Sequence, residues 1–398
     1  MSTIDERAGA LAAELVDVRR RLHAHPEPSG AEVQTTAAIA ERLRQEGLAP
    51  VVLRSGTGLV CDLGGRIEAG TPYVVLRADI DALSMPDAKD VPYRSRNHGV
   101  AHACGHDVHT TVVLGAGLVL HPLLGGARRV RLVFEPREET VPGGAVEVIE
   151  DGWIEGASAV FGLHCDPKLD VGRLAVRVGP ITSASDLVEL RLHGPGGHTA
   201  RPHLTVDLVA VAGRLAADLP SVVSRLAQPD GQAALVFGSL NAGTAPNVIP
   251  AEAVLRGTLR TPSPAAWARA PQLLEAAVDE VLAGTGATRH IGYFRGVPPV
   301  VNDEAATGLL AQAGREVLGE DAVVAAEHSM GGDSFAWYLE EVPGSYARLG
   351  VHDPASDGPR LDLHASTFDV DERCIGYGVR VLARAALAAL DGLDPARS

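Results

Sequence analysis

The sequence is poor in cysteine, contains no long apolar run and has no excess of basic residues. Its four cysteines lie far apart and are too few to cross-link 398 residues, so we expect reduced thiols. No stretch approaches the roughly 20 apolar residues that a membrane span needs. The charged segment up to Arg21 also lacks the uninterrupted apolar run of a signal peptide. These absences together predict a cytoplasmic protein.

Acidic residues outnumber basic ones, which gives a formal net charge of −15 and a pI near 5.4. Nucleic acids and anionic membranes attract basic surfaces, so neither is an expected partner. The hydrophobic content of 46% is sufficient for a packed globular protein. Because a typical domain has roughly 100–200 residues, the length favours two domains.

Short apolar runs followed by polar residues recur in the first half of the chain. Tyr73 to Ala78, Val130 to Phe134 and Ala159 to Leu163 are typical of buried strands, and helical patterns lie between them. The residues that follow these strands have ligand chemistry: Asp79 and Asp81, Glu138 and Glu139, and His164. The pattern predicts an α/β domain. It has a mostly parallel sheet flanked by helices, with its chemistry at the carboxyl edge of the strands.

The pattern changes after Ser185, because Asp186 to Leu192 alternates apolar and polar residues as a half-exposed antiparallel strand does. From there to Phe294 the predicted order is strand, helix, strand, strand, helix, strand, which is a ferredoxin-like α+β unit. We therefore predict a discontinuous catalytic domain, residues 1–180 and 296–398, and an inserted domain, residues 181–295. The edge of the inserted sheet favours contact with a second copy of the chain.

Thiol, imidazole and carboxylate side chains occur in glycine-flanked contexts, and they are the ligands of a borderline divalent ion such as Zn²⁺. Cys104 and His106 lie two residues apart around a glycine at a predicted helix start. His164, at a strand end, and His364, in a loop, are further candidates. Each residue alone would more often be structural, so the argument depends on the set. Two histidines flank the first pair and are alternatives as ligands: His102 and His109.

The adjacent residues Glu138 and Glu139 can divide the work at such a centre. Successive residues after a strand cannot both point at one metal in the same way, so one binds the metal and the other is left to move a proton. A solvated glutamate pair at a helix start is the alternative. Asp79 and Asp81 are candidates to orient an imidazole ligand, and we prefer Asp81.

Two residues of the inserted domain are candidates to assist catalysis. His198 lies in a Gly-rich connection and can donate a hydrogen bond to a developing oxyanion. Asn247, in Ala-Pro-Asn-Val-Ile-Pro, can do the same or hold a substrate carboxylate. As isolated residues both would more often belong to loop structure.

Across nearly its whole length the chain resembles the metallopeptidase-like amidohydrolases, a family that includes aminoacylases, hippurate hydrolases and auxin-amino-acid conjugate hydrolases. Several segments carry the resemblance: Leu22-His-Ala-His-Pro-Glu27, Arg77-Ala-Asp-Ile-Asp-Ala-Leu83, His102-Ala-Cys-Gly-His-Asp107, Glu138-Glu139, His164, Gly196-Gly-His198, Asn247-Val-Ile-Pro250 and Met330-Gly-Gly332.

The resemblance implies a metal-dependent amidohydrolase that cleaves the amide bond of N-acyl amino acids such as N-acetyl or benzoyl conjugates. It implies two divalent ions, Zn²⁺, Mn²⁺, Co²⁺ or Ni²⁺, with Glu138 as general base and acid. The implied ligands are Cys104, His106, Glu139, His164 and His364. It also implies a homodimer formed through the inserted domain, in which His198 reaches an active site, often that of the partner subunit.

Two other functions stay open at this point. One is a dipeptidase or aminopeptidase, which would need an acidic anchor for a free amino terminus. The other is a catalytically silent homologue that only binds metal. Two departures from the family pattern also bear on function. Arg137 stands where a small residue is usual before the glutamates, and Ser334 replaces the second acid of a usual acidic pair.

Overall fold

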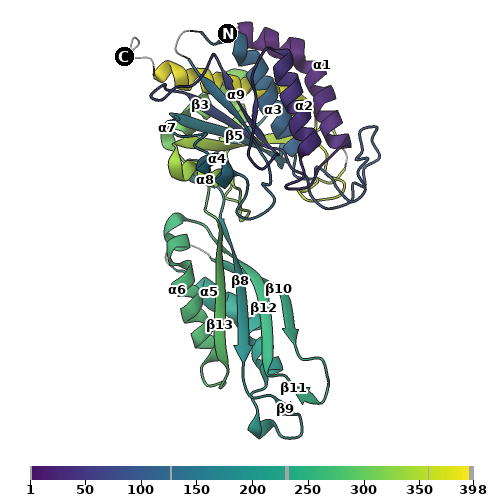
Figure 1. Cartoon of the computed structure of the whole chain (residues 1–398), viewed down its shortest axis with the longest axis vertical. Coiled ribbons are helices and arrows are strands. Elements are labelled where there is room, and N and C mark those ends of the chain that lie inside the picture. Colours follow the sequence, from purple (N-terminus) through teal and green to yellow (C-terminus); the bar gives the residue numbers. More distant parts are fainter. Residues whose placement is uncertain (1, 126–127, 229–232, 357, 394–398) are drawn as a thin grey trace. The chain divides into compact units, whose positions relative to one another are not determined.

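The computed structural model describes residues 2–125, 128–228, 233–356 and 358–393. The chain forms two compact units (Figure 1). The first contains Met1–Ile181, Val301–Glu327 and Ser334–Ser398, and the second contains Thr182–Val300 and His328–Asp333. The short return to the second unit was not expected from the sequence. It follows from backbone hydrogen bonds that Ser183 N–H donates to Ser329 and Gly331, at 3.0 and 3.1 Å.

An eight-stranded mixed sheet forms the centre of the first unit, in the order β1-β2-β4-β3-β5-β16-β6-β15. Its strands are β1 (Val51–Val52), β2 (Leu59–Leu63), β3 (Val74–Asp79), β4 (Val130–Glu135), β5 (Ala159–Asp170), β6 (Leu174–Val176), β15 (Val323–Ala325) and β16 (Gly344–His352). The four central strands, β4, β3, β5 and β16, run parallel. Every residue of β3 and β4 is buried, as expected for strands covered on both faces.

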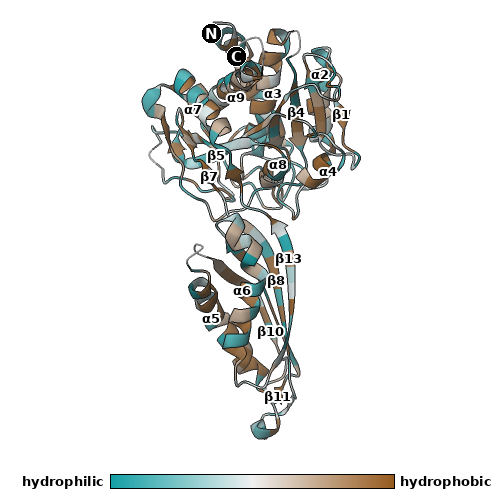
Figure 2. Cartoon of the chain, turned by 90° about the vertical axis from the view of Figure 1, so that its left-hand side faces the viewer, coloured by the Kyte–Doolittle hydropathy of each residue, from teal (hydrophilic) through white to brown (hydrophobic). Residues whose placement is uncertain are grey.

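Helices cover both faces of this sheet. They are α1 (Ser2–Ala24), α2 (Val33–Gln45), α3 (His106–Leu120), α4 (Ala145–Glu150), α7 (Glu304–Leu318), α8 (Phe335–Glu341) and α9 (Arg373–Gly392). In Figures 1 and 2, α3 and α9 lie on the side of the sheet opposite α4 and α8. Helix α3 is buried along its whole length, and its glycines allow close packing. A Cβ atom added at Gly117 would meet Leu132 at 2.4 Å.

The second unit is a four-stranded antiparallel sheet in the order β10-β12-β8-β13 with two long helices. Its main elements are β8 (Ala184–His193), α5 (Leu208–Leu226), β10 (Ala234–Ala242), β12 (Glu252–Thr261), α6 (Pro264–Leu282) and β13 (Thr288–Val297). Asp207 caps α5 and Ser263 caps α6 through side-chain oxygens that accept backbone N–H groups. Hydrophobic and hydrophilic residues alternate along α6 (Figure 2). The predicted fold class is confirmed, including the ferredoxin-like element order.

Some local features differ from the predictions. Strand β5 continues to Asp170, so His164 lies inside the strand and not at its end, because β16 pairs with β5 in register well past this point. Helix α8 was not predicted, and neither were several minor elements: β7 (Gly179–Pro180), β9 (Gly197–His198), β11 (Val248–Ile249), β14 (Val301–Asn302), η1 (His121–Leu123), η2 (Pro202–Leu204) and η3 (Glu320–Ala322). Two- and three-residue elements are too short for any periodicity. Among the described residues, no helix is long and apolar enough to cross a membrane.

Candidate metal centre

The side chains proposed as metal ligands lie together in the first unit. Cys104 Sγ lies 3.6 Å from His164 Nε2, and His364 Nε2 lies 3.4 Å from Glu139 Oε1. His106 Nε2 joins the two pairs, at 3.8 Å from the same Glu139 oxygen. Among the described residues, three groups of ligand atoms, each within 4.8 Å, include the proposed ligands: Cys104, His106 and His164; Cys104, Glu139 and His364; and His106, Glu138 and Glu139. A fourth group shares His106 and adds Asp79 and His109.

The start of α3 places two of these side chains. Cys104 and Gly105 directly precede the helix, and His106 is its first residue. Gly105 has φ +90°, and a Cβ atom there would meet Cys165 Sγ at 2.7 Å. Only glycine permits this conformation and this close approach at low cost. The prediction that the Cys-Gly-His segment starts a helix is therefore confirmed.

Hydrogen bonds at the far ring nitrogens orient two histidines toward the centre. His106 Nδ1 lies 3.0 Å from the Asp81 carbonyl oxygen and 3.2 Å from its Oδ1. His164 Nδ1 donates to the Cys165 carbonyl at 2.7 Å. When neutral, as a metal ligand must be, each ring therefore carries its proton on Nδ1 and presents an Nε2 lone pair. Within the described part of the chain, His106 Nε2 has no hydrogen-bond partner although it is buried.

Glu139 and His364 approach from two loops. The Glu139 backbone N–H donates to Asp81 Oδ2 at 3.0 Å, and the His364 N–H donates to the Ala103 carbonyl at 2.7 Å. Glu139 Oε1 is buried and lacks a hydrogen-bond partner among the described residues. The side chain of His364 is 54% exposed, so this edge of the centre is open to solvent. Orphaned, converging donor atoms of these types fit a divalent ion.

Burial controls the charge of the thiol and of one imidazole. It raises the pKa of the Cys104 thiol and, together with the cationic Arg348, lowers the pKa of His164 well below its usual range. Burial is the largest influence on His106 and opposes its charge, but the Asp79 carboxylate together with Cys104 and Asp81 outweighs burial and raises the pKa of that ring. Because metals bind thiolate, occupation of this centre must release the Cys104 proton.

The two alternative histidines have other surroundings. His109 Nδ1 donates to Asp79 Oδ1 at 2.7 Å, and its Nε2 accepts from the Cys165 N–H at 2.8 Å. Both of its nitrogens are thus engaged, although His109 lies within 4.8 Å of ligand atoms of Asp79 and His106. His102 belongs to none of the ligand groups found in the described residues, and burial lowers its pKa to about 3.

Asp81, the carboxylate that we prefer as the group that orients an imidazole ligand, is itself held in place by hydrogen bonds. Its Oδ2 accepts a hydrogen bond of 2.6 Å from Ser29 Oγ, in the loop before α2. Burial disfavours its charge, but hydrogen bonds from His106, Ser29 and the Glu139 N–H lower its pKa below the usual range. The sequence analysis missed Ser29, because a single serine so far along the chain gives no pattern.

The two departures from the family pattern have separate environments. The Arg137 guanidinium pairs with Glu147, and its backbone has φ +60°. Its positive charge is therefore shared with an acid other than Glu138 or Glu139. Ser334 is buried, and its backbone N–H donates to Glu138 Oε1 at 3.2 Å.

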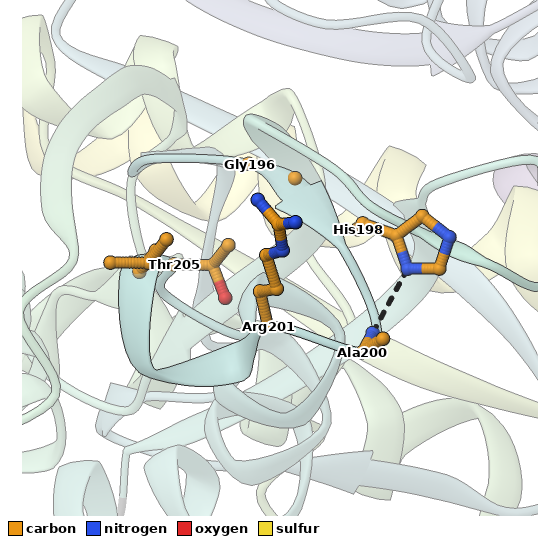
Figure 3. A pocket seen from close by; sticks show the side chains of 7 residues that line it. Gly196, His198, Ala200, Arg201 and Thr205 are labelled. Atoms are coloured by element: carbon orange, nitrogen blue, oxygen red, sulfur yellow. Dashed lines mark hydrogen bonds between the residues drawn. The ribbon is translucent and has the colours of Figure 1, made fainter.

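His198 and Asn247 are brought together in the second unit. His198 lies in β9, which pairs with β11 directly after Asn247, and the Thr199 N–H donates to the Asn247 carbonyl at 3.2 Å. Both side chains are exposed. His198 and Arg201 line a pocket of about 510 Å³, shown in Figure 3. The Ala200 N–H donates to His198 Nδ1 at 3.0 Å, so a neutral ring carries its proton on Nε2.

Known proteins resemble this chain in sequence and in structure. The profile of peptidase family M20/M25/M40 matches residues 75–388. A putative glutamate–cysteine ligase of Rhodococcus jostii is 47% identical over 93% of this chain, but the chain spans only 46% of that protein. An N-acetyl-L-cysteine deacetylase of Bacillus subtilis is 36% identical over 97% of this chain and 91% of that protein. A solved dinuclear metal-binding M20 peptidase of Bacillus subtilis has TM-score 0.83 and 32% identity, covering 96% of this chain and 99% of that one.

Proposed function

The chain belongs to peptidase family M20/M25/M40, and we propose that it hydrolyses the amide bond of N-acyl amino acids to a carboxylate and a free amino acid. One observation carries the proposal. The orphaned atoms of His106 and Glu139 meet a thiol and two further imidazoles beside Glu138, which is a second carboxylate. In this assignment two divalent ions are held by Cys104, His106, Glu139, His164 and His364. When bound, the ions supply Lewis acidity that polarises the amide carbonyl and acidifies water.

Glu138 is the general base and acid in this proposal. Its carboxylate accepts a proton from the attacking water and later delivers a proton to the departing amine. Its Oε2 lies 3.9 Å from His106 Nε2, beside the ligand set, while Oε1 accepts the Ser334 N–H. One oxygen is thus held by the protein, and the other faces the centre where the proton must be taken up.

His198 donates to the oxyanion that develops on the amide carbonyl. Because its Nδ1 accepts the Ala200 N–H, its Nε2–H is the available donor. Asn247, which directly precedes the strand that pairs with β9, is assigned to the oxyanion or to the substrate carboxylate. Either role requires a polar side chain that is not itself a metal ligand.

N-acetyl-L-cysteine is the first substrate to test. Two relatives from Bacillus subtilis, 36% and 34% identical to this chain, are named for the deacetylation of N-acetylcysteine. Their names support hydrolysis that releases free cysteine, within the broader class of N-acyl amino acids.

The test compares blocked and unblocked substrates on metal-reconstituted protein. After chelation, Zn²⁺, Mn²⁺, Co²⁺ or Ni²⁺ is restored, and turnover is measured on N-acetyl-L-cysteine, other N-acetyl amino acids, N-benzoylglycine and unblocked dipeptides. We expect metal-dependent turnover of the blocked compounds. Faster cleavage of unblocked dipeptides would assign the enzyme to the dipeptidases, and metal binding without any turnover would indicate a silent homologue.

The role of Glu138 has its own test. Glu138→Gln should lower kcat by about 10²- to 10⁴-fold, the usual contribution of a positioned acid–base group, with the metal content unchanged. Turnover within about tenfold of the unmodified enzyme would disprove the assignment.

We also propose that the second unit forms a homodimer. Strands β10 and β13 are the edges of its sheet, and Val236 on β10 is 61% exposed. Unpaired strand edges with apolar side chains favour pairing with another chain. Light scattering after size-exclusion chromatography should give twice the mass of the chain, and a monomer at all concentrations would refute the dimer.

A further inference from the structure

Ser334 lies between two buried side chains of opposite charge. Its hydroxyl donates to Glu135 Oε1 at 2.6 Å and accepts from Arg77 Nη2 at 3.0 Å. Ser334 and Glu135 are 0% exposed, and Arg77 is 1% exposed. In such surroundings water cannot screen charges, so a change of charge at position 334 would interact strongly with both Glu135 and Arg77.

The guanidinium of Arg77 already has two carboxylate partners. Its Nε donates to Glu135 Oε2 at 2.7 Å, and its Nη1 donates to Asp79 Oδ2 at 2.8 Å. A carboxylate at position 334 would be a third, in contact with that of Glu135. Two carboxylates at that separation without solvent cannot both stay ionised. The neutral Ser334 avoids this conflict.

The same network reaches the general base. The Ser334 N–H donates to Glu138 Oε1 at 3.2 Å. Glu135 Oε1 also accepts the Ala145 N–H at 2.8 Å, so one carboxylate holds the starts of both α4 and α8. The turn after Glu138 packs closely here, because a Cβ atom at Gly143 would meet the Ser334 Cβ at 2.5 Å. A shift of Ser334 would therefore displace the hydrogen bond that fixes Glu138.

We propose that Glu135 supplies, beside Arg77, the negative charge that the resemblance leads us to expect from an acid at position 334, and that Ser334 is thereby a positioning residue for Glu138. The departure at position 334 is a relocation of charge and not a loss of function. Arg77 is the shared cation of the network, pairing with Glu135 here and able to pair with an acid at position 334. The inference rests on the proposed function only through the role of Glu138.

A double-mutant cycle tests the relocation. Glu135→Gln removes one negative charge from the network, and Ser334→Asp adds one. Each single variant therefore changes the net charge around Arg77. The double variant restores a second carboxylate partner for Arg77 beside Asp79, and the amide introduced at position 135 can donate a hydrogen bond to the new carboxylate. We expect each single change to lower kcat at least about tenfold with KM within about twofold, and the double variant to recover to within about threefold of the unmodified enzyme.

Several controls keep the outcomes distinct. Glu150→Gln removes the same charge at an exposed position and should leave kcat and KM unchanged. Metal content should stay constant in all variants, because Ser334 and Glu135 are in none of the ligand groups of the described residues. If Ser334→Asp alone does not fold, recovery of folded, active protein in the double variant still supports the relocation. A double variant as impaired as the product of the single effects, or one that stays unfolded, overturns it.

Glu138→Gln, measured in parallel, separates this inference from the proposed function. If Glu138→Gln retains turnover, the assignment of the base fails, whatever the cycle shows. If Glu138→Gln is inactive and the cycle shows no recovery, only the relocation of charge fails. Recovery in kcat at constant KM, together with an inactive Glu138→Gln variant, supports both.

Discussion

Replacing Asp81 with asparagine should weaken metal binding without unfolding the protein. The carboxylate accepts at both oxygens: Oδ1 faces His106 Nδ1 at 3.2 Å, and Oδ2 accepts from Ser29 Oγ at 2.6 Å and from the Glu139 N–H at 3.0 Å. An amide of the same shape has one acceptor and one donor. In either orientation an N–H group must therefore face the N–H of His106 or of Glu139.

The structure limits the size of this effect. The Asp81 backbone carbonyl also lies 3.0 Å from His106 Nδ1, so the ring keeps a partner that fixes its tautomer. Asp81→Asn should therefore weaken metal binding mainly because the Glu139 N–H loses an acceptor and because a negative charge near the metal is removed. Removing a group that orients ligands typically costs 10- to 100-fold in metal affinity, which corresponds to about 1.4–2.8 kcal/mol.

The assay is a titration of metal-free protein with Zn²⁺ in competition with a chelating indicator. Asp90→Asn is the matched control, because it removes the same charge at an exposed position. Ser29→Ala, which deletes only the brace of Asp81, should give a smaller loss than Asp81→Asn. If Asp81→Asn binds Zn²⁺ within about twofold of the unmodified chain, Asp81 does not orient the ligands.

Three further predictions concern separate parts of the structure. Glu139→Gln should lose bound metal and activity together, whereas Glu138→Gln should lose activity alone. Elemental analysis of the metal content, measured together with kcat, distinguishes the two variants. Equal loss of metal in both would contradict the division of roles. Cys104→Ser should reduce the rise in melting temperature on adding Zn²⁺, whereas the buried core variant Cys61→Ser should keep it, because only Cys104 belongs to a ligand group of the described residues. Burial disfavours the charged Asp87 carboxylate, but hydrogen bonds and an ion pair with His23, Ser95 and Lys89 outweigh burial and lower the pKa of Asp87. The ionised carboxylate therefore stabilises the folded protein fully above about pH 4, and this contribution is lost as the pH falls further. Asp87→Asn should thus cost about 1.5–3 kcal/mol in denaturant unfolding at pH 7 and less at pH 3, and an undiminished cost at pH 3 would contradict the assignment.

The patterns that predicted the fold are local. Continuous apolar runs at β3 and β4 indicated strands covered on both faces, and the alternation in β8 indicated a sheet with one exposed face; the burial of these strands agrees. Such signals involve neighbours in the chain and need no knowledge of the tertiary structure.

Other features depend on residues far apart in the chain. The length of β5 depends on its pairing with β16, about 180 residues later, which is why His164 was expected at a strand end. The brace of Asp81 by Ser29 and the contact of Ser334 with Glu135 join segments that carry no shared pattern. The role of Arg137 was equally hidden, since its ion pair with Glu147 is set by the conformation of the turn between them.

The amino-acid sequence by itself determined which ligand chemistry is present and on which strands and loops it lies, because ligand type and hydrophobic periodicity are properties of the chain. The tertiary structure alone decided which ring nitrogen of His106 and His164 is presented, that Glu138 accepts a hydrogen bond from the backbone of Ser334, and that Glu135 lies beside Arg77 as a buried carboxylate. Those features depend on hydrogen-bond partners and burial, and both arise only when distant segments pack together.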